Sequence, residues 1–352
     1  MLSILTIDEK ERWNEIVKSF QNYDVYYLAS YVKAFELHGD GQPLLVFYED
    51  QTIRAINVVM KRDLSKDKRF MGKIPTNTFF DFATPYGFGG FLIDGEIKEE
   101  AVQRLEQEYR SFCQKEGIVT EVVRFHPVTK NSEALHTIYE IATLGKTITV
   151  EMESMDQIQE NLVKSNKYKI KKSLKAGVEV SWGWDKELIE EFIALYNETM
   201  KGNNATDYYY FNQAFYMNVL QELTDQAMIV SAEYEKQKIA MAIILISNQQ
   251  LHYHLSALNR DFSELRPMNI LLYEVACWGL NNGYKTFHLG GGLGSREDNL
   301  YAFKRSFNKN SNSVFKIGKK IFSERDYEML LQIRREEPDF VLNENYFPAY
   351  RS

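Results

Sequence analysis

The chain has 352 residues, which is more than a single hydrophobic core usually supports, so two domains are expected. Hydrophobic residues make up 44% and charged residues 26% of the sequence, as in an ordinary globular protein, and the 22 Tyr and 22 Phe residues argue against a disordered chain. The net charge of −7 argues against a protein that coats nucleic acid, but it does not exclude a local basic site.

Residues 1–8 lack the basic start and the long apolar run of a signal peptide. The longest aliphatic run, at 239–246, is too short to cross a bilayer and suits a buried strand. The two cysteines, Cys113 and Cys277, have no Cys or His at metal-ligand spacing, so neither a disulfide framework nor a zinc site is expected. We therefore expect a cytoplasmic protein without a metal site.

The first half of the sequence predicts an amphipathic helix, a second helix, two strands joined at Asp50-Gln51, a segment with a Pro-Tyr-Gly turn, a long helix and two more strands. These elements are expected at 8–20, 26–39, 43–50, 52–63, 78–94, 96–117, 118–128 and 145–152.

The second half approximates the same order. A lysine-rich helix, a strand and two helices precede three consecutive strands, and helices then alternate with strands up to a final charged helix. The expected bounds are 158–177, 178–184, 186–202, 209–223, 226–235, 237–248, 250–261, 268–283, 284–292, 299–307 and 313–322. This pattern predicts an α+β fold of two similar domains, 1–150 and 151–352, that meet near 147–156.

The stretch "FHLGGGLGSREDNLYAFKRSF", at 287–307, places three glycines between an expected strand and a helix that begins at Asp298 or Asn299. Glycines let a backbone approach a ligand or turn through positive φ, and the N–H groups at a helix start can hold an anion or an oxyanion. The alternative is a sharp strand-to-helix turn that simply needs small residues. The stretch matches neither a phosphate loop nor a dinucleotide fingerprint.

Lys304 adds a functional candidate to this stretch. On the expected helix, Leu300, Phe303 and Phe307 recur at three-to-four spacing and predict an apolar face, with Lys304 one step off it. A lysine at the rim of a buried face can reach into a cleft and stabilise negative charge on a carbonyl or a phosphate. The alternative is that Lys304 extends into solvent.

A second candidate is the lysine-rich segment "KSNKYKIKKSLK", which predicts a basic stripe on one helix face. Lys164, Lys167, Lys171 and Lys175 follow helical spacing, and no acidic residue is interleaved. Such a stripe suggests a phosphate-bearing partner, either a nucleotide-sugar, a lipid pyrophosphate or RNA. The alternative is a solvated helix face.

Two turns in the first half carry further candidates. "TPYGFGG", at 84–90, presents the Tyr86 hydroxyl on a rigid turn where it can hold a polar substrate, unless the turn is only a connection. "RFHP", at 124–127, places His126 at a strand end, where it is either a base or a hydrogen-bonded structural histidine.

The strand "QLHYHLSALNRD" predicts His252 and His254 on one face and Tyr253 on the other. Two histidines at this spacing can ligate a metal, but no third ligand is evident. A polar groove face is therefore favoured.

Taken together, these blocks resemble the FemA/FemB/FemX-like branch of the GNAT acyltransferase superfamily. The signature runs from "YHLSALNRDF" through "LLYEVACWGLNNGYKTFHLGGG" to "NLYAFKRSF", and "TPYGFGG", "RFHP" and "SNKYKIKKSLKAGVEV" precede it in the expected order. The resemblance implies two tandem GNAT-like domains with mixed central sheets flanked by helices, and transfer of an acyl group to an amine. In the best-known members, aminoacyl-tRNA donates an amino acid to a peptidoglycan precursor.

The resemblance also implies roles for individual residues. Phe303 and Lys304 would line an acyl-transfer channel, with Lys304 stabilising the oxyanion and the leaving group, and Tyr86 would help to hold the acceptor. The remaining substrate-binding positions would be Lys33, Lys167 and Lys171, which face acceptor phosphates, together with Tyr253, Gly291 and Gly292.

Two departures from the family pattern bear on the donor. Members that use acetyl-CoA have a glycine-rich pyrophosphate loop where this chain has "ALNRDFSELRPMN", without glycine, which disfavours CoA. The helical arm common in tRNA-using members has no counterpart here. The acyl donor, aminoacyl-tRNA or acyl-CoA, therefore stays open, and no tightly bound cofactor is expected.

The expected partners are the acyl donor, a phosphate-bearing cell-envelope precursor and, peripherally, a membrane surface. The acceptor would be an amine of peptidoglycan or of a surface polysaccharide. Two alternatives are a CoA-dependent N-acetyltransferase acting on an amino sugar and a non-catalytic GNAT-like binding module. The oligomeric state stays open.

Overall fold

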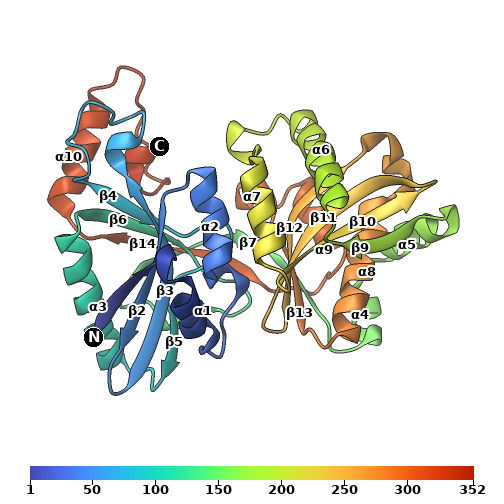
Figure 1. Ribbon diagram of the computed structural model, residues 1–352, viewed down its shortest axis with the longest axis horizontal. Coiled ribbons are helices and arrows are strands. Elements are labelled where there is room, and N and C mark those ends of the chain that lie inside the picture. Colours follow the sequence, from blue (N-terminus) through green and yellow to red (C-terminus); the bar gives the residue numbers. More distant parts are fainter. The chain divides into compact units, whose positions relative to one another are not determined.

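The computed structural model describes residues 1–352, which divide into two compact units (Figure 1). Unit 1 comprises Met1–Leu144 and Phe315–Ser352, and unit 2 comprises Gly145–Val314. The strands β7 (Glu140–Lys146) and β14 (Val314–Ile321) cross the two boundaries. The structure thus differs from the predicted division into 1–150 and 151–352, because β14 pairs with β6 and so returns the C-terminal segment to unit 1.

Unit 1 is built on an eight-stranded mixed sheet in the order β1-β2-β3-β4-β6-β14-β7, with β5 also pairing with β3. The strands not yet given are β1 (Leu2–Thr6), β2 (Gln42–Glu49), β3 (Ile53–Asp63), β4 (Phe80–Ala83), β5 (Leu92–Gly95) and β6 (Ile118–Arg124). Strands β4 and β6 run parallel, whereas β1–β2, β2–β3, β3–β4 and β6–β14 are antiparallel.

Four helices belong to unit 1: α1 (Lys10–Lys18), α2 (Ala29–His38), α3 (Glu99–Lys115) and α10 (Glu324–Arg335). In α3 the buried residues Val102, Leu105 and Tyr109 recur at helical spacing and pack into the core of the sheet. Helix α2 ends at Gly39, whose φ of +99° suits the left-handed cap that glycine provides.

Ion pairs fix the end of the chain to unit 1. The Arg351 guanidinium lies 2.5 Å from the buried Asp81 carboxylate and 2.7 Å from Asp67, and Arg62 lies 2.7 Å from Asp81. The Tyr350 hydroxyl is 2.7 Å from the Thr120 hydroxyl. These contacts give the physical reason why the C-terminal residues fold with the N-terminal half.

Unit 2 is built on a six-stranded sheet in the order β8-β13-β12-β11-β10-β9. Its strands are β8 (Ile148–Glu151), β9 (Glu179–Gly183), β10 (Ala227–Tyr234), β11 (Gln237–Ser247), β12 (Gln250–Leu258) and β13 (Thr286–Gly290). Only β12 and β13 run parallel, and the other neighbours are antiparallel.

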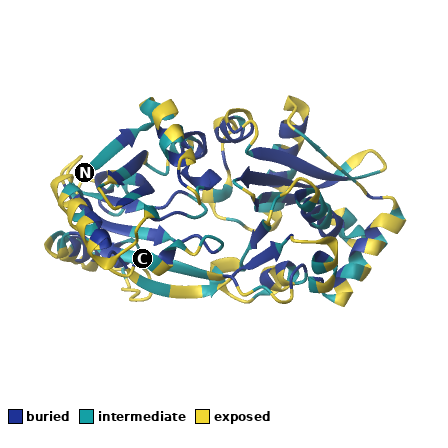
Figure 2. Cartoon of the chain, turned by 90° about the horizontal axis from the view of Figure 1, so that it is seen from below, coloured by how far each residue is buried: buried dark blue, intermediate teal, exposed yellow.

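Strand β11 is buried from Ile239 to Ser247 because helices cover both faces of the sheet (Figure 2). Ala240, Ala242 and Ile244 belong to the same core cluster as α8, and α6 also contacts β11. The helices of unit 2 are α4 (Met155–Asn161), α5 (Lys164–Ala176), α6 (Lys186–Gly202), α7 (Gln213–Met217), α8 (Pro267–Asn281) and α9 (Asn299–Arg305).

The single helix predicted at 158–177 is wrong, since α4 and α5 are separated by an extended step at Leu162 and Val163. The Val163 N–H donates to the Ser306 carbonyl at the end of α9, and the Leu162 side chain is buried. Tertiary contacts therefore override a sequence that carries no helix breaker. None of the helices combines the length and the apolar character that crossing a membrane requires.

Candidate functional site

The candidate site lies in unit 2, where the parallel strands β12 and β13 part. Their ladder consists of three pairs, which join Gln250, Leu251 and His252 to Thr286, Phe287 and His288. Strand β12 continues to Leu258 without a partner on this side, because β13 ends at Gly290.

The three glycines at the end of β13 are required by the backbone conformation or by close neighbouring atoms. Gly290 has a φ of +78°, and a Cβ on Gly291 would lie 2.9 Å from the Lys146 carbonyl oxygen. A Cβ on Gly292 would lie 2.1 Å from the Arg296 carbonyl oxygen. The tight-turn interpretation of the glycine run is thus supported, and the turn brings the Gly291 carbonyl to the point where the strands part.

Lys304 reaches this point from α9. Its ammonium donates a hydrogen bond to the Gly291 carbonyl at 2.7 Å and lies 5.8 Å from the centre of the Tyr253 ring on β12. The side chain is only 9% exposed. Burial lowers the pKa of Lys304 to about 8, and the nearby Asp298 carboxylate opposes part of this shift. Lys304, Tyr253 and Gly291, which the sequence proposed separately, are therefore neighbours.

The predicted apolar face of α9 was wrong in one respect. Leu300 is exposed, whereas Tyr301 and Lys304 form the buried face, and Phe307 is buried just after the helix. Lys304 thus lies on the buried face and not one step off it. Phe303 is half-buried, and its ring packs edge-to-face on Phe307 with centroids 5.4 Å apart.

Asp298 caps α9 and closes the glycine turn. Its carboxylate accepts the Tyr301 N–H at 2.9 Å and the Leu293 N–H at 3.0 Å, and these backbone bonds, led by that of Tyr301, lower its pKa. The Leu293 N–H, the backbone donor that follows Gly292, is therefore already hydrogen-bonded to the Asp298 carboxylate. Glu297 forms an ion pair with Lys146 at 2.8 Å, so neither acid is placed as a base.

The predicted alternation along β12 is interrupted by a β-bulge. Tyr253 faces Ile244 and Leu255 faces Ile243 on β11, so His254 is an extra residue in β12. Burial lowers the pKa of His254 to about 3, with a smaller contribution from His252, so His254 is neutral at physiological pH.

A polar network between β13 and the neighbouring strand β8 was not predicted from the sequence. The Thr149 hydroxyl lies 3.0 Å from Nδ1 of His288 and 2.8 Å from the Ser313 hydroxyl. The Asn308 amide donates to the Thr149 carbonyl at 2.7 Å. Only the histidine of "HLGGG" hinted at this network, because its partners come from distant parts of the sequence.

The candidates in unit 1 are held by their own neighbours. Tyr86 accepts a hydrogen bond at its carbonyl from the Tyr31 hydroxyl at 2.6 Å, and its ring stacks on Phe35. Lys33 forms an ion pair with Glu36 at 2.6 Å. Arg124 fixes the Pro-Tyr-Gly turn by donating to the carbonyls of residues 84, 85 and 87.

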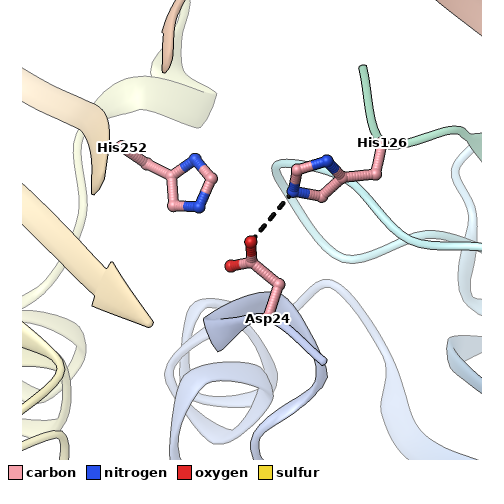
Figure 3. A group of neighbouring side chains, drawn as sticks. All are labelled: Asp24, His126 and His252. Carbon is pink, nitrogen blue, oxygen red and sulfur yellow. Dashed lines mark hydrogen bonds and ion pairs between the residues drawn. The ribbon is translucent and has the colours of Figure 1, made fainter. Parts of the chain in front are cut away.

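His126 is a hydrogen-bonded, buried histidine, the second of its two predicted interpretations. Nε2 lies 3.0 Å from the Asp24 carboxylate (Figure 3), and Nδ1 accepts the N–H groups of Val128 and Thr129. The proton therefore resides on Nε2 and points at Asp24.

Helix α5 covers the start of α8, where a phosphate-binding loop would end. Pro267 lacks an N–H, and the side-chain amide of Asn269 donates to the side-chain carbonyl of the buried Asn166 of α5 at 2.7 Å. The Ser173 hydroxyl of α5 donates to the Leu265 carbonyl at 2.6 Å. Lys167 and Lys171 lie on the same helix, with Lys171 exposed and Lys167 half-buried.

Comparison with known proteins gives one family match and several structural ones. Residues 161–305 match the model of an acetyltransferase (GNAT) domain. No curated protein matches the chain.

Among solved structures, FemX has a TM-score of 0.68 at 13% identity, covering 94% of this chain and 99% of that chain. The C-terminal domain of an Agrobacterium fabrum protein described as a lysylphosphatidylglycerol synthetase has a TM-score of 0.59 at 14% identity, covering 92% and 95%. A Bacteroides thetaiotaomicron protein of unknown function has a TM-score of 0.58 at 12% identity, covering 91% and 100%.

The fold expected from the FemA/FemB/FemX-like resemblance is thus confirmed in two mixed sheets flanked by helices. The chain thus shares the fold of FemX, and its residues 161–305 match an acetyltransferase (GNAT) domain, which indicates an acyltransferase.

Proposed function

We propose that this chain is an aminoacyl-type N-acyltransferase that acts in the cytoplasm on an amine of a cell-envelope precursor. The observation that supports the chemistry is the buried ammonium of Lys304, held between the Gly291 carbonyl and the Tyr253 ring. A desolvated cation that is fixed before the reaction begins stabilises developing negative charge more strongly than one in water.

The proposed reaction requires that the amine and the aminoacyl ester are held close together and that the Lys304 ammonium lies near the carbonyl oxygen. The amine nitrogen attacks the ester carbonyl carbon, a C–N bond forms, and the carbonyl oxygen becomes an oxyanion that the ammonium stabilises. When the C–O bond to the ribose breaks, the ribose oxygen takes a proton from Lys304. The attacking nitrogen loses its proton to water, and Lys304 is reprotonated from solvent. With a pKa of about 8, Lys304 can donate this proton near neutral pH.

The start of α8 supports aminoacyl-tRNA as the donor in place of acyl-CoA. A pyrophosphate needs free backbone N–H groups at a helix start or in a glycine-rich nest. Here Pro267 provides none, Met268 and Asn269 are buried, and α5 packs over the turn. An ester-linked donor needs no pyrophosphate pocket.

For the acceptor, the support is the family resemblance together with the lysines. An amine of peptidoglycan or of a surface polysaccharide precursor is the proposed nucleophile, and its phosphates would contact Lys167 in unit 2. For unit 1, the resemblance suggests Lys33 as a phosphate-binding residue. Tyr86 would contact the sugar or the peptide, and Phe303 would line the acyl channel.

The test compares donors on the purified protein with a nucleotide-linked muropeptide precursor as acceptor. Mass spectrometry should detect the aminoacylated precursor with charged tRNA, and Lys304→Met should reduce turnover at least about 100-fold. The control Lys201→Met changes an exposed lysine at the end of α6 and should retain turnover. Product formed from acetyl-CoA alone would support an amino-sugar acetyltransferase, and binding without product from any donor would support a non-catalytic module.

A further inference from the structure

The solvent face of α5 concentrates positive charge around one exposed aromatic ring. Tyr168 is 71% exposed, and at helical spacing Lys164, Lys171 and Lys172 are its neighbours on the same face, four residues before and three and four residues after it. Lys175 continues this face by one more turn. The opposite face, formed by Asn166, Ile170 and Ser173, is buried.

This charge is scarcely neutralised within the fold. No acidic residue lies between Glu160 and Glu179. Of the lysines on α5, only Lys172 has an ion pair, with Glu264 at 3.6 Å. In a chain of net charge −7, a cluster with one ion pair among its lysines indicates a polyanionic partner.

Two polyanions carry enough charge, namely a nucleic acid and an anionic membrane. A helix that lies in a membrane interface inserts a broad apolar face. The apolar face of α5 is already used, since Ile170 packs into the core cluster beneath it. Outward it presents one tyrosine and, at the edge, Leu174. A single exposed ring among lysines suits RNA, where a base stacks on the ring and the lysines contact phosphates.

We infer that the solvent face of α5, formed by Lys164, Tyr168, Lys171, Lys172 and Lys175, docks RNA and receives the body or the single-stranded end of the donor tRNA. This inference rests on the proposed function. It assigns the phosphates at Lys171 to the donor and leaves Lys167, which is half-buried, to the acceptor. It also provides a platform for tRNA in a chain without a helical arm.

The test measures binding of fluorescein-labelled unfractionated tRNA by anisotropy across a salt series. Lys171→Glu/Lys175→Glu should weaken binding at least about tenfold and reduce the dependence of log affinity on log salt by about two. The control Lys201→Glu/Lys236→Glu changes the same net charge at exposed lysines elsewhere in unit 2 and should stay within about twofold of the wild type. Tyr168→Ala should weaken binding at least about fivefold, whereas Tyr168→Phe should retain it.

Equal weakening by both double variants would overturn the inference, as would wild-type protein that binds no tRNA. If the α5 variants lose binding to phosphatidylglycerol vesicles but bind tRNA as the wild type does, α5 is a membrane-binding face. That result would also overturn the inference. If the wild type transfers the aminoacyl group from charged tRNA and the α5 variants keep the same KM for charged tRNA, the docking inference fails but the proposed donor stands. If tRNA binding depends on α5 but no aminoacyl group is transferred from charged tRNA, the proposed donor fails but the docking inference stands.

Discussion

At the scale of residues, Lys304 is a lysine whose position costs folding free energy. Its pKa in the folded chain is about 8, below its ordinary value of 10.5, so the unfolded chain binds more protons between these pH values. Stability therefore rises with pH from about 8 to 10.5, and below pH 8 the full cost applies. This cost is about 3 kcal/mol. A residue kept at such a cost is a candidate for function more than for structure.

We accordingly expect Lys304→Met to be at least as stable as the wild type at pH 7, because removing the buried charge outweighs losing one hydrogen bond worth about 1 kcal/mol. The advantage should shrink by pH 10, where the wild-type lysine is largely neutral. Urea unfolding at both pH values measures this difference. A variant that loses more than about 1 kcal/mol at pH 7 would show that Lys304 is a structural residue.

At the scale of elements, the turn from β13 to α9 determines where Lys304 points. Gly292→Ala would place a Cβ 2.1 Å from the Arg296 carbonyl oxygen and 2.3 Å from the Asp298 carboxylate. We expect the cap of α9 to be displaced, the free energy of unfolding to fall by about 1–3 kcal/mol, and turnover to fall with it.

Gly294→Ala is the matched control for this turn. Gly294 has a φ of +58°, and a Cβ there has open space, so only about 1–2 kcal/mol of left-handed strain applies. Its turnover should stay close to that of the wild type. Gly292 itself has an ordinary φ of −85°, so left-handed strain does not apply to it. If both alanine variants lose turnover equally, the displaced cap of α9 is not the cause of the loss.

Some strands and helices could be predicted from the sequence, and others could not. Strands with clear alternation or a continuous apolar run, such as β2, β3 and β11, were placed within one or two residues, and so was the start of α9. The bulge at His254 and the break at Val163 were not predicted, because each depends on a partner from a distant segment. For the same reason the sequence suggested Lys304, Tyr253 and Gly291 one by one, but not that they touch.

At the scale of the whole molecule, the chain leaves unit 1 in β7, forms unit 2 and returns in β14. A sequence read in order predicts two consecutive domains, since no composition change marks the return. The returning segment is held at its end by Asp81, which is fully buried. Burial alone would raise the pKa of Asp81, but Arg62 and Arg351 lower it overall. Asp81 therefore stabilises unit 1 above the carboxyl pKa of the unfolded chain, and this contribution is lost as pH falls.

Asp81→Asn should test this closure, because it leaves two arginines without their shared carboxylate. Breaking a buried pair in this way costs about 3–5 kcal/mol. Hydrogen exchange should show faster exchange across unit 1, including β1 and β2 at the far end of the sequence, while β10, β11 and β12 of unit 2 keep their protection. The control Glu344→Gln makes the same carboxylate-to-amide change at an exposed site in the returning segment and should leave both units unchanged. Exchange that accelerates only in the returning segment would mean that its ion pairs hold the tail and not the unit.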